Sequence, residues 1–177
     1  MNHFGKHLLH GMLWLLGSEV LCLILAVSLA ILHDHPVIRL IGLIFGIAAH
    51  VLLIRNCAQK AADEDAALYR TSGAQIRIIK PLLIGVCLTA PSYLTYLLLT
   101  VNPESILMLN LFPLLNAPFI QIYRFLIAGA EPFSAVAQSR RILMLLPPVL
   151  TAIAYVTGFI SKYYPAIAAH DARSNRT

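Results

Sequence analysis

An acid and a histidine lie within two neighbouring apolar stretches of the sequence. Glu19 falls in residues 8–32 and His50 in residues 37–54. A carboxyl group near the centre of a bilayer costs about 2.5–3.5 kcal/mol to insert unless it is protonated or paired. If the two stretches are helices that fold back at the turn between them, positions 19 and 50 are equally far from that turn and lie at one depth. We therefore predict a hydrogen bond between Glu19 and His50.

This predicted pair has two alternative roles. A carboxylate beside an imidazole titrates as a coupled unit, which can carry or sense a proton. The same pair can instead act as a clamp that sets the register of two helices. Gly42, Gly46 and Ala49 lie on the side of His50 and allow the helices to approach closely. The sequence leaves both roles open.

A second group of polar residues follows the third and fourth apolar stretches, residues 81–101 and 106–127. In each stretch the polar side chains recur at helical spacing, with prolines among them that leave backbone carbonyls without their usual donors. Such groups can replace water around a solute, and they can equally hydrogen-bond neighbouring helices. The predicted substrate path comprises Thr89, Ser92, Tyr93, Tyr96, Asn110, Asn116, Gln121 and Arg124.

Three histidines near the N-terminus share one helical face. His3, His7 and His10 are spaced by four and three residues, and three imidazoles is the ligand count of many catalytic zinc sites. The sequence shows no further ligands to support them, so we expect interfacial histidines, no metal and no other cofactor. Motifs of hydrolases, zinc proteases and phosphate-binding loops are absent from the sequence, and we expect neither catalytic residues nor an enzyme.

The composition defines the solvent for which this chain is suited. The sequence is 59% hydrophobic and 12% charged, with a mean hydropathy of +0.77. These values exclude a water-soluble enzyme, a disulfide-stapled secreted module and a disordered tail. The net charge of +5 comes from bases that flank apolar stretches. We therefore expect anionic lipid at the cytoplasmic face as the partner, and no nucleic acid.

The fold class follows from the length of the apolar stretches, since a helix needs about 20 apolar residues to cross a bilayer. We predict an all-α, polytopic integral membrane helical bundle in which residues 1–165 form a single domain and residues 166–177 a flexible polar tail. Residues 55–80 form a cytoplasmic helical loop. The bundle has about five transmembrane helices, near residues 8–32, 37–54, 81–101, 106–127 and 142–161.

The last of these spans has an alternative, because Pro147 and Pro148 kink or restart a helix. In that version the helix begins at Pro147 and residues 132–146 form an amphipathic helix in the membrane interface. A re-entrant last segment is a further alternative. We prefer five spans because lipid-exposed re-entrant backbone is not tolerated without covering protein.

The distribution of Lys and Arg predicts a cytoplasmic N-terminus. With five spans, nine of the 13 basic residues then lie in the cytoplasm. The other four are Arg39, Lys162, Arg173 and Arg176.

Together these features predict a multi-pass protein of the cell membrane. We expect an oligomeric transporter or channel-like protein for a small polar solute or ion, because a homo-oligomer supplies the walls that five short spans lack. The alternative is a non-catalytic accessory or scaffold subunit of a larger membrane complex. Such a subunit would dock to a partner membrane subunit through its polar faces and the acidic residues 63–65.

Overall fold

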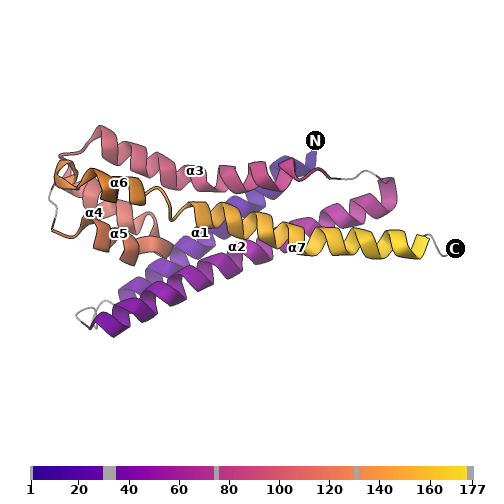
Figure 1. Cartoon of the computed structure of the whole chain (residues 1–177), viewed down its shortest axis with the longest axis horizontal. Helices are drawn as coiled ribbons and strands as arrows, with labels where there is room; N and C mark the ends of the chain where they lie inside the picture. The colour runs from indigo at the N-terminus through magenta and orange to yellow at the C-terminus, as the bar shows by residue number, and fades with distance from the viewer. Residues whose placement is uncertain (1, 30–34, 74–75, 130–131, 175–177) are drawn as a thin grey trace.

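The chain forms an elongated bundle of helices (Figure 1), and the computed structural model describes residues 2–29, 35–73, 76–129 and 132–174. Within these ranges all regular structure is helical, which confirms the all-α prediction. The α-helices are α1 (Asn2–Ser28), α2 (Pro36–Ser72), α3 (Ile79–Val101), α4 (Ile106–Leu114), α5 (Ile120–Ile127), α6 (Gln138–Leu143) and α7 (Val149–Ser174). Two 3₁₀ turns, η2 (Ala117–Phe119) and η3 (Phe133–Ala135), lie between them.

Helices α1, α2 and α3 are each long and apolar enough to cross a membrane. Large apolar side chains cover their outer faces; Leu9, Leu13 and Leu16 of α1, for example, are all exposed. Exposed leucines suit lipid, which is as apolar as they are. The first three predicted spans are therefore confirmed as candidate membrane helices, and the chain has the layout of a multi-pass membrane protein.

Helix α2 is longer than the bilayer requires. It begins at Pro36, a residue favoured in the first turn of a helix, and it ends at Gly73, which has a left-handed φ of 69°. The 37 residues of α2 thus include the apolar stretch and most of the predicted helical loop, residues 55–72. This extension carries the acidic residues 63–65 beyond the apolar stretch.

The fourth predicted span, residues 106–127, is not one helix. Helix α4 and the segment Ala117–Ile127 meet at an angle of 93°. Asn116 leaves the helical region with φ −131° and ψ 50°. Pro118 has no N–H to donate, and its ring would clash with the preceding turn of a continuous helix. The segment is therefore a broken span or a re-entrant loop, and only if it counts as one span do the candidates number four among the described residues.

The fifth predicted span is also different in the structure. Helix α7 begins at Val149, directly after the two prolines, so the restart alternative describes it better than a helix from Ile142. Residues 132–146 form η3 and the short α6 in place of one amphipathic helix. Among the described residues, α7 is not one of the candidate membrane spans.

Helix α7 continues to Ser174, through most of the segment from Ala166 for which the sequence predicts a flexible tail. Tyr163 and Ile167 are buried in the same apolar cluster as Ala62 and Ala66 of α2. This packing, together with alanines that favour helix, keeps the segment ordered as helix.

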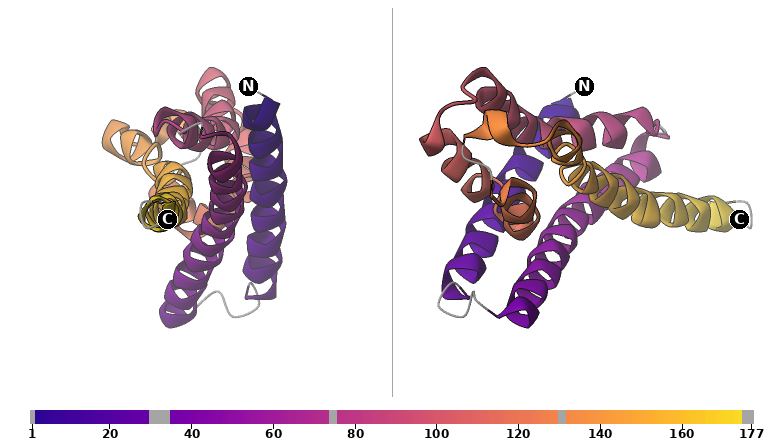
Figure 2. Two further views of the ribbon diagram at one scale, coloured as in Figure 1. Left: turned by 90° about the vertical axis from the view of Figure 1, so that its right-hand side faces the viewer. Right: turned by 60° about the vertical axis from the view of Figure 1, so that its left-hand side comes forward.

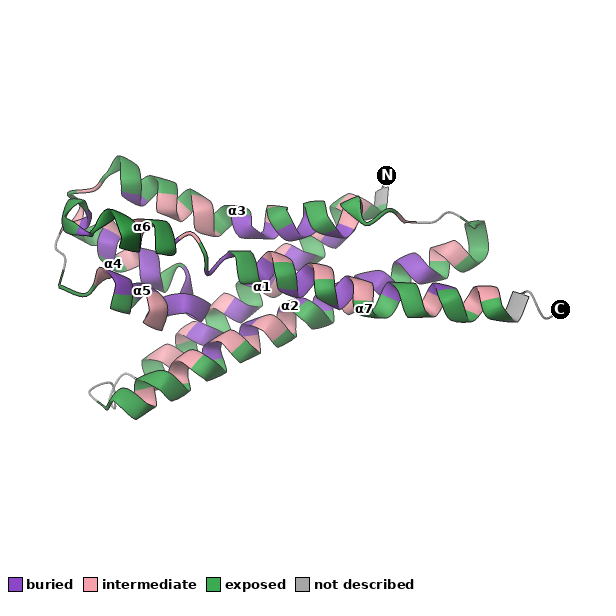
Figure 3. Cartoon of the chain, in the orientation of Figure 1, coloured by how far each residue is buried: buried purple, intermediate pink, exposed green. Residues whose placement is uncertain are grey.

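The main core lies where α7 packs along α2 and across α3 (Figures 1 and 2). Small residues of α2, such as Cys57, Ala58 and Ala61, meet Tyr155 and Phe159 of α7. Figure 3 shows the buried faces of these helices turned toward each other. Small side chains permit the close helix approach that packing in a membrane requires.

Both ends of the folded chain lie at one end of the bundle. Figure 1 shows the start of α1, the end of α2, the start of α3 and the end of α7 together there. Helices α4, α5 and α6 gather at the opposite end, where α3 finishes. The last third of the chain thus goes from α3 into α4–α6 at one end and returns through α7 to the other.

Gly158 sets the distance between α7 and α2. A Cβ at this position would lie 2.8 Å from the carbonyl oxygen of Arg55 and 2.9 Å from its Cγ. We expect Gly158→Ala to push the two helices apart and to destabilise the protein by about 1–3 kcal/mol. Thermal unfolding in detergent measures this effect.

The matched control is Gly17→Ala, because nothing lies within 4 Å of a Cβ at Gly17. Alanine is the better helix former there and should leave stability unchanged or raise it by about 0.5–1 kcal/mol. Equal unfolding temperatures for the two variants would contradict the close contact.

Candidate functional site

A buried histidine joins three helices at the centre of the bundle. His50 of α2 is 1% exposed. Its Nδ1 lies 2.8 Å from the Ser18 hydroxyl of α1, and its Nε2 lies 2.8 Å from the Thr151 hydroxyl of α7. The Ser18 hydroxyl donates to the Leu15 carbonyl at 2.9 Å, so a neutral His50 that donates from Nδ1 and accepts at Nε2 satisfies every group. His50 therefore acts as an interhelical tie.

Glu19 does not bond to His50, and the predicted hydrogen bond between them is wrong. The Glu19 carboxylate accepts the backbone N–H of Ala117 at 2.7 Å, while both ring nitrogens of His50 are bonded elsewhere. Consecutive residues of a helix differ by about 100° in direction. Ser18 consequently faces α2, and Glu19 faces η2. The sequence thus predicted the level of the partner of His50 along α1 to within one residue, but not the side of α1 from which it comes.

Glu19 meets the chain at the break after α4. Ala117 begins η2, and the N–H groups at the start of a helical segment have no partner within it. The Glu19 carboxylate supplies the missing acceptor. The 3₁₀ turn is packed among α1, α2, α4 and α5, and the ring of Phe119 contacts the His50 ring edge-on at 5.4 Å. The break thus lies against the central polar residues.

Two polar groups near the break have no hydrogen-bond partner in the part of the chain that the structure describes. Asn116 is fully buried, and its amide nitrogen donates to the Thr95 hydroxyl at 3.1 Å and the Phe112 carbonyl at 2.9 Å. Within residues 2–29, 35–73, 76–129 and 132–174, neither its Oδ1 nor the buried hydroxyl of Tyr123 has a hydrogen bond. Buried polar atoms usually find partners, so these two are exceptions in an otherwise bonded interior.

The polar face of α3 is used mostly for packing. The Tyr93 hydroxyl donates to the Leu145 carbonyl and the Tyr96 hydroxyl to the Arg141 carbonyl, each at 3.1 Å. Thr89 bonds within its own helix, and Ser92 is half-buried beside these residues. The two tyrosines therefore hold α6 and the turn after it against α3. Thr95, which the sequence pattern does not single out, links α3 to Asn116.

The other predicted path residues line two pockets at the opposite end of the bundle from the termini. Asn110 and Arg124 line a pocket of about 650 Å³ between α4 and α5. Gln121 and Arg124 line a second pocket of about 550 Å³ against the start of α2. No α3 residue lines either pocket in the described part of the chain. The residues of the predicted path thus fall into two groups, one on α3 and one around the two pockets. Asn116, which bonds to Thr95, connects the break to α3.

Charged residues gather at the end that holds the start of α1. Glu64 Oε2 lies 2.7 Å from Lys6 Nζ and 3.1 Å from His7 Nε2, and this bond to Lys6 lowers the pKa of the Glu64 carboxyl. Asp65 is fully buried and lies 2.6 Å from Lys80 Nζ. Asp63 pairs with Lys162 at 3.8 Å. All three acids of the predicted docking triplet therefore have partners within the chain.

The His50 tie predicts a specific cost for removing one hydroxyl. Thr151→Val keeps the side-chain volume but leaves the Nε2 atom of His50 without a partner. We expect a loss of stability of about 1 kcal/mol, typical of an interhelical hydrogen bond in a membrane protein. Thermal unfolding in detergent measures it.

Thr157→Val is the control for this change on the same helix. Thr157 is exposed, and its hydroxyl bonds only to carbonyls of α7, at 2.7 and 3.3 Å. Its replacement should leave stability nearly unchanged. A Thr151→Val protein as stable as wild type would show that His50 does not depend on α7.

Comparisons with known protein families, with curated proteins and with solved structures find no match. The function of this chain is therefore inferred from its own geometry.

Proposed function

We propose that this chain is a non-catalytic, multi-pass membrane protein that moves a small polar solute or ion across the cell membrane, as a homo-oligomer. The observation that carries the proposal is the break between α4 and η2, where Glu19 binds the N–H of Ala117. Transporters commonly place their binding sites at broken helices, because the free backbone groups there can bind charge. In this chain an acid of the protein itself binds that backbone group.

Neutralising Glu19 would weaken its hydrogen bond to the Ala117 N–H. A carboxylate accepts a hydrogen bond more strongly than a carboxylic acid does, because hydrogen bonds to ionised acceptors are the stronger ones. A proton or a cation at Glu19 would therefore free the segment that begins at Ala117. That segment also carries Gln121 and Arg124, which line the two pockets. Binding at the acid is thereby linked to the position of the pocket walls.

The homo-oligomer is supported by Arg124. This arginine is exposed, lines both pockets and makes no hydrogen bond within the described residues. A charge in that position needs water or protein around it. A second copy of the chain would supply a wall for the pockets and cover the arginine.

We also propose a topology with both ends of the folded chain in the cytoplasm. The start of α1 and the end of α7 lie at one end of the bundle, so the number of crossings is even (Figure 1). In this topology α1, α2 and α3 cross and α4–α5 dips in from outside. Helix α7, which is not by itself among the candidate spans of the described residues, crosses back together with α6. This replaces the external C-terminus of the five-span version. Lys6 and Lys80 lie near the starts of α1 and α3 and Arg70 near the end of α2, and these bases favour an orientation with this end beside cytoplasmic anionic lipid.

Cysteine labelling tests the topology. In a chain whose Cys22, Cys57 and Cys87 are replaced by alanine, a membrane-impermeant maleimide should label Glu104→Cys in intact cells. It should label Ala169→Cys only after the membrane is permeabilised, because α7 ends in the cytoplasm. Labelling of Ala169→Cys in intact cells would support five spans instead.

A second candidate function is a non-catalytic accessory subunit. The observation in its favour is that Tyr93 and Tyr96 are bonded within the chain, as a packing role requires. The pairing of Asp63, Glu64 and Asp65 with internal bases argues against docking through these acids. The flux experiment below separates the two functions.

Purified protein in liposomes tests the transport proposal. Proton, potassium and chloride movements are followed with dyes and compared with empty vesicles. We expect movement of at least one of them, and a fall to the level of empty vesicles in Glu19→Gln. Glutamine keeps an oxygen for the Ala117 N–H but cannot bind a proton or a cation as a carboxylate does.

Arginine variants complete the experiment. Arg124→Ala should change the flux because it alters both pockets, whereas Arg70→Ala, an exposed arginine that bonds to its own helix at Ala66, should not. Full flux in Glu19→Gln contradicts the role of the acid. An inert protein that co-purifies with another membrane chain is the accessory subunit.

A further inference from the structure

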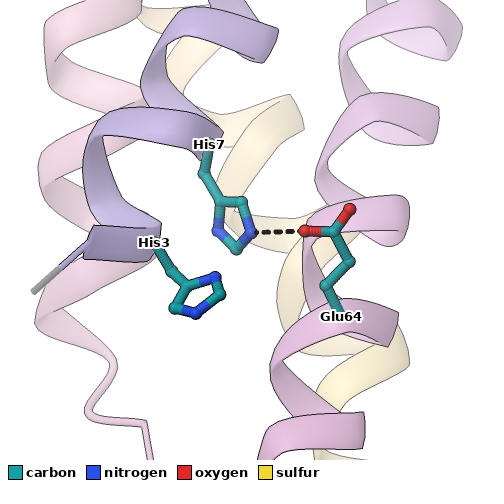
Figure 4. A group of neighbouring side chains, drawn as sticks. All are labelled: His3, His7 and Glu64. Carbon is teal, nitrogen blue, oxygen red and sulfur yellow. Dashed lines mark hydrogen bonds and ion pairs between the residues drawn. The ribbon is translucent and has the colours of Figure 1, made fainter.

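Two histidines and a glutamate converge where α1 starts beside the extension of α2. His3 and His7 are one helical turn apart on α1, and Glu64 faces them from α2 (Figure 4). One ligand atom from each of the three residues lies within 4.8 Å of the others. Ligand atoms around a single zinc ion lie about 3.3–3.5 Å apart, so the side chains would rotate toward one another on binding.

The surroundings of His7 provide a second, independent observation. His7 is 3% exposed, and its Nδ1 has no hydrogen bond to any residue that the structure describes. This nitrogen lies 3.8 Å from the carboxylate of Asp65, which is itself buried and held by Lys80. Its other nitrogen, Nε2, lies 3.1 Å from Glu64. Each ring nitrogen of His7 therefore faces a carboxylate.

A neutral imidazole has one proton, so one of these two contacts brings a lone pair toward a carboxylate oxygen. If Nδ1 carries the proton toward Asp65, the lone pair of Nε2 points at Glu64. Two lone pairs that converge in this way are what a cation requires. Histidine ligands usually donate their second ring nitrogen to a carboxylate, which orients the ring, and Asp65 is placed for that role.

The donor set indicates the kind of ion. Two imidazole nitrogens and one carboxylate oxygen suit zinc and similar divalent transition metals, whereas magnesium and calcium prefer oxygen ligands alone. Lys6 Nζ and His7 Nε2 share Oε2 of Glu64, at 2.7 and 3.1 Å, so an ion at His7 would either displace Lys6 from Oε2 or bind Oε1 after a rotation of the carboxylate. We propose that His3, His7 and Glu64 bind one divalent transition-metal ion of the zinc class, with Asp65 orienting His7.

The site is independent of the proposed transport, since it lies at the charged end and not at the break. It differs from the three-histidine face that the sequence indicates, because Glu64 takes the place of His10. The ring of His10 instead accepts a hydrogen bond from the Trp14 indole at 3.0 Å. A metal ion bound here would connect the start of α1 to the part of α2 that carries Glu64.

Calorimetry with zinc chloride tests the proposal on full-length, untagged protein that has been treated with a chelator. We expect one zinc per chain, and affinity at least about tenfold weaker in His3→Ala and in Glu64→Gln. Both residues are exposed, so these changes leave the packing of α1 and α2 in place. Excess magnesium should not compete. Cobalt bound in place of zinc should give the visible absorption of a low-coordinate site, and the two variants should lose it.

His10→Ala is the matched control, an exposed histidine on the same helix that should leave the zinc affinity unchanged. The proposal is overturned if the wild-type chain does not bind zinc, or if Glu64→Gln binds it as tightly as wild type. Equal losses in His10→Ala and His3→Ala would assign the binding to the histidine face of α1 and also overturn it.

Discussion

The carboxylate of Glu19 accepts a hydrogen bond from the backbone N–H of Ala117, and this bond gives each of the two groups a partner. Water cannot complete the bonding of backbone groups within a bilayer, so a broken helix is stable there only if protein supplies the partners. The turn at Asn116 frees the N–H groups at the start of η2, and α1 provides an acceptor 2.7 Å away. This contact lets the chain after α4 bend by 93° and remain in the bundle.

The two halves of the bundle differ in how completely they are bonded. Along α2 and α7 the core is closely packed, Gly158 brings the two helices together, and His50 ties both to α1. Around the break, Asn116 and Tyr123 keep unpaired polar atoms, and two pockets lie beside α5. The movement that the proposed transport function needs would use segments of low local stability. The segment α4–α5 meets that requirement better than the α2–α7 pair does.

Apolar length was enough to predict α1, α2 and α3, whereas it placed the last helix at residues 142–161; only the alternative based on the proline pair came close to the observed start at Val149. The side of each helix from which a residue points was harder to predict. Helix α1 is apolar on nearly every face, so nothing in its pattern shows whether Ser18 or Glu19 faces His50. The use of Tyr93 and Tyr96 depends on α6, which covers them from 45 or more residues away. Likewise, His7 and Glu64 meet across 57 positions, a contact that no local spacing encodes.

Charged side chains gather at one end of the bundle, where they form ion pairs, and Glu19 is an exception because it lies on α1 away from that end. At the charged end the acids have bases beside them, as in Lys6–Glu64 and Lys80–Asp65. Near the centre the contacts join neutral groups, as around His50. Glu19 has no base among its bonding partners in the described part of the chain; its one hydrogen bond comes from a backbone N–H. One such bond offsets only part of the cost of a charge at this depth. The remainder favours any proton or cation that reaches the acid, and the proposed coupling of ion binding to movement of the broken helix rests on this balance.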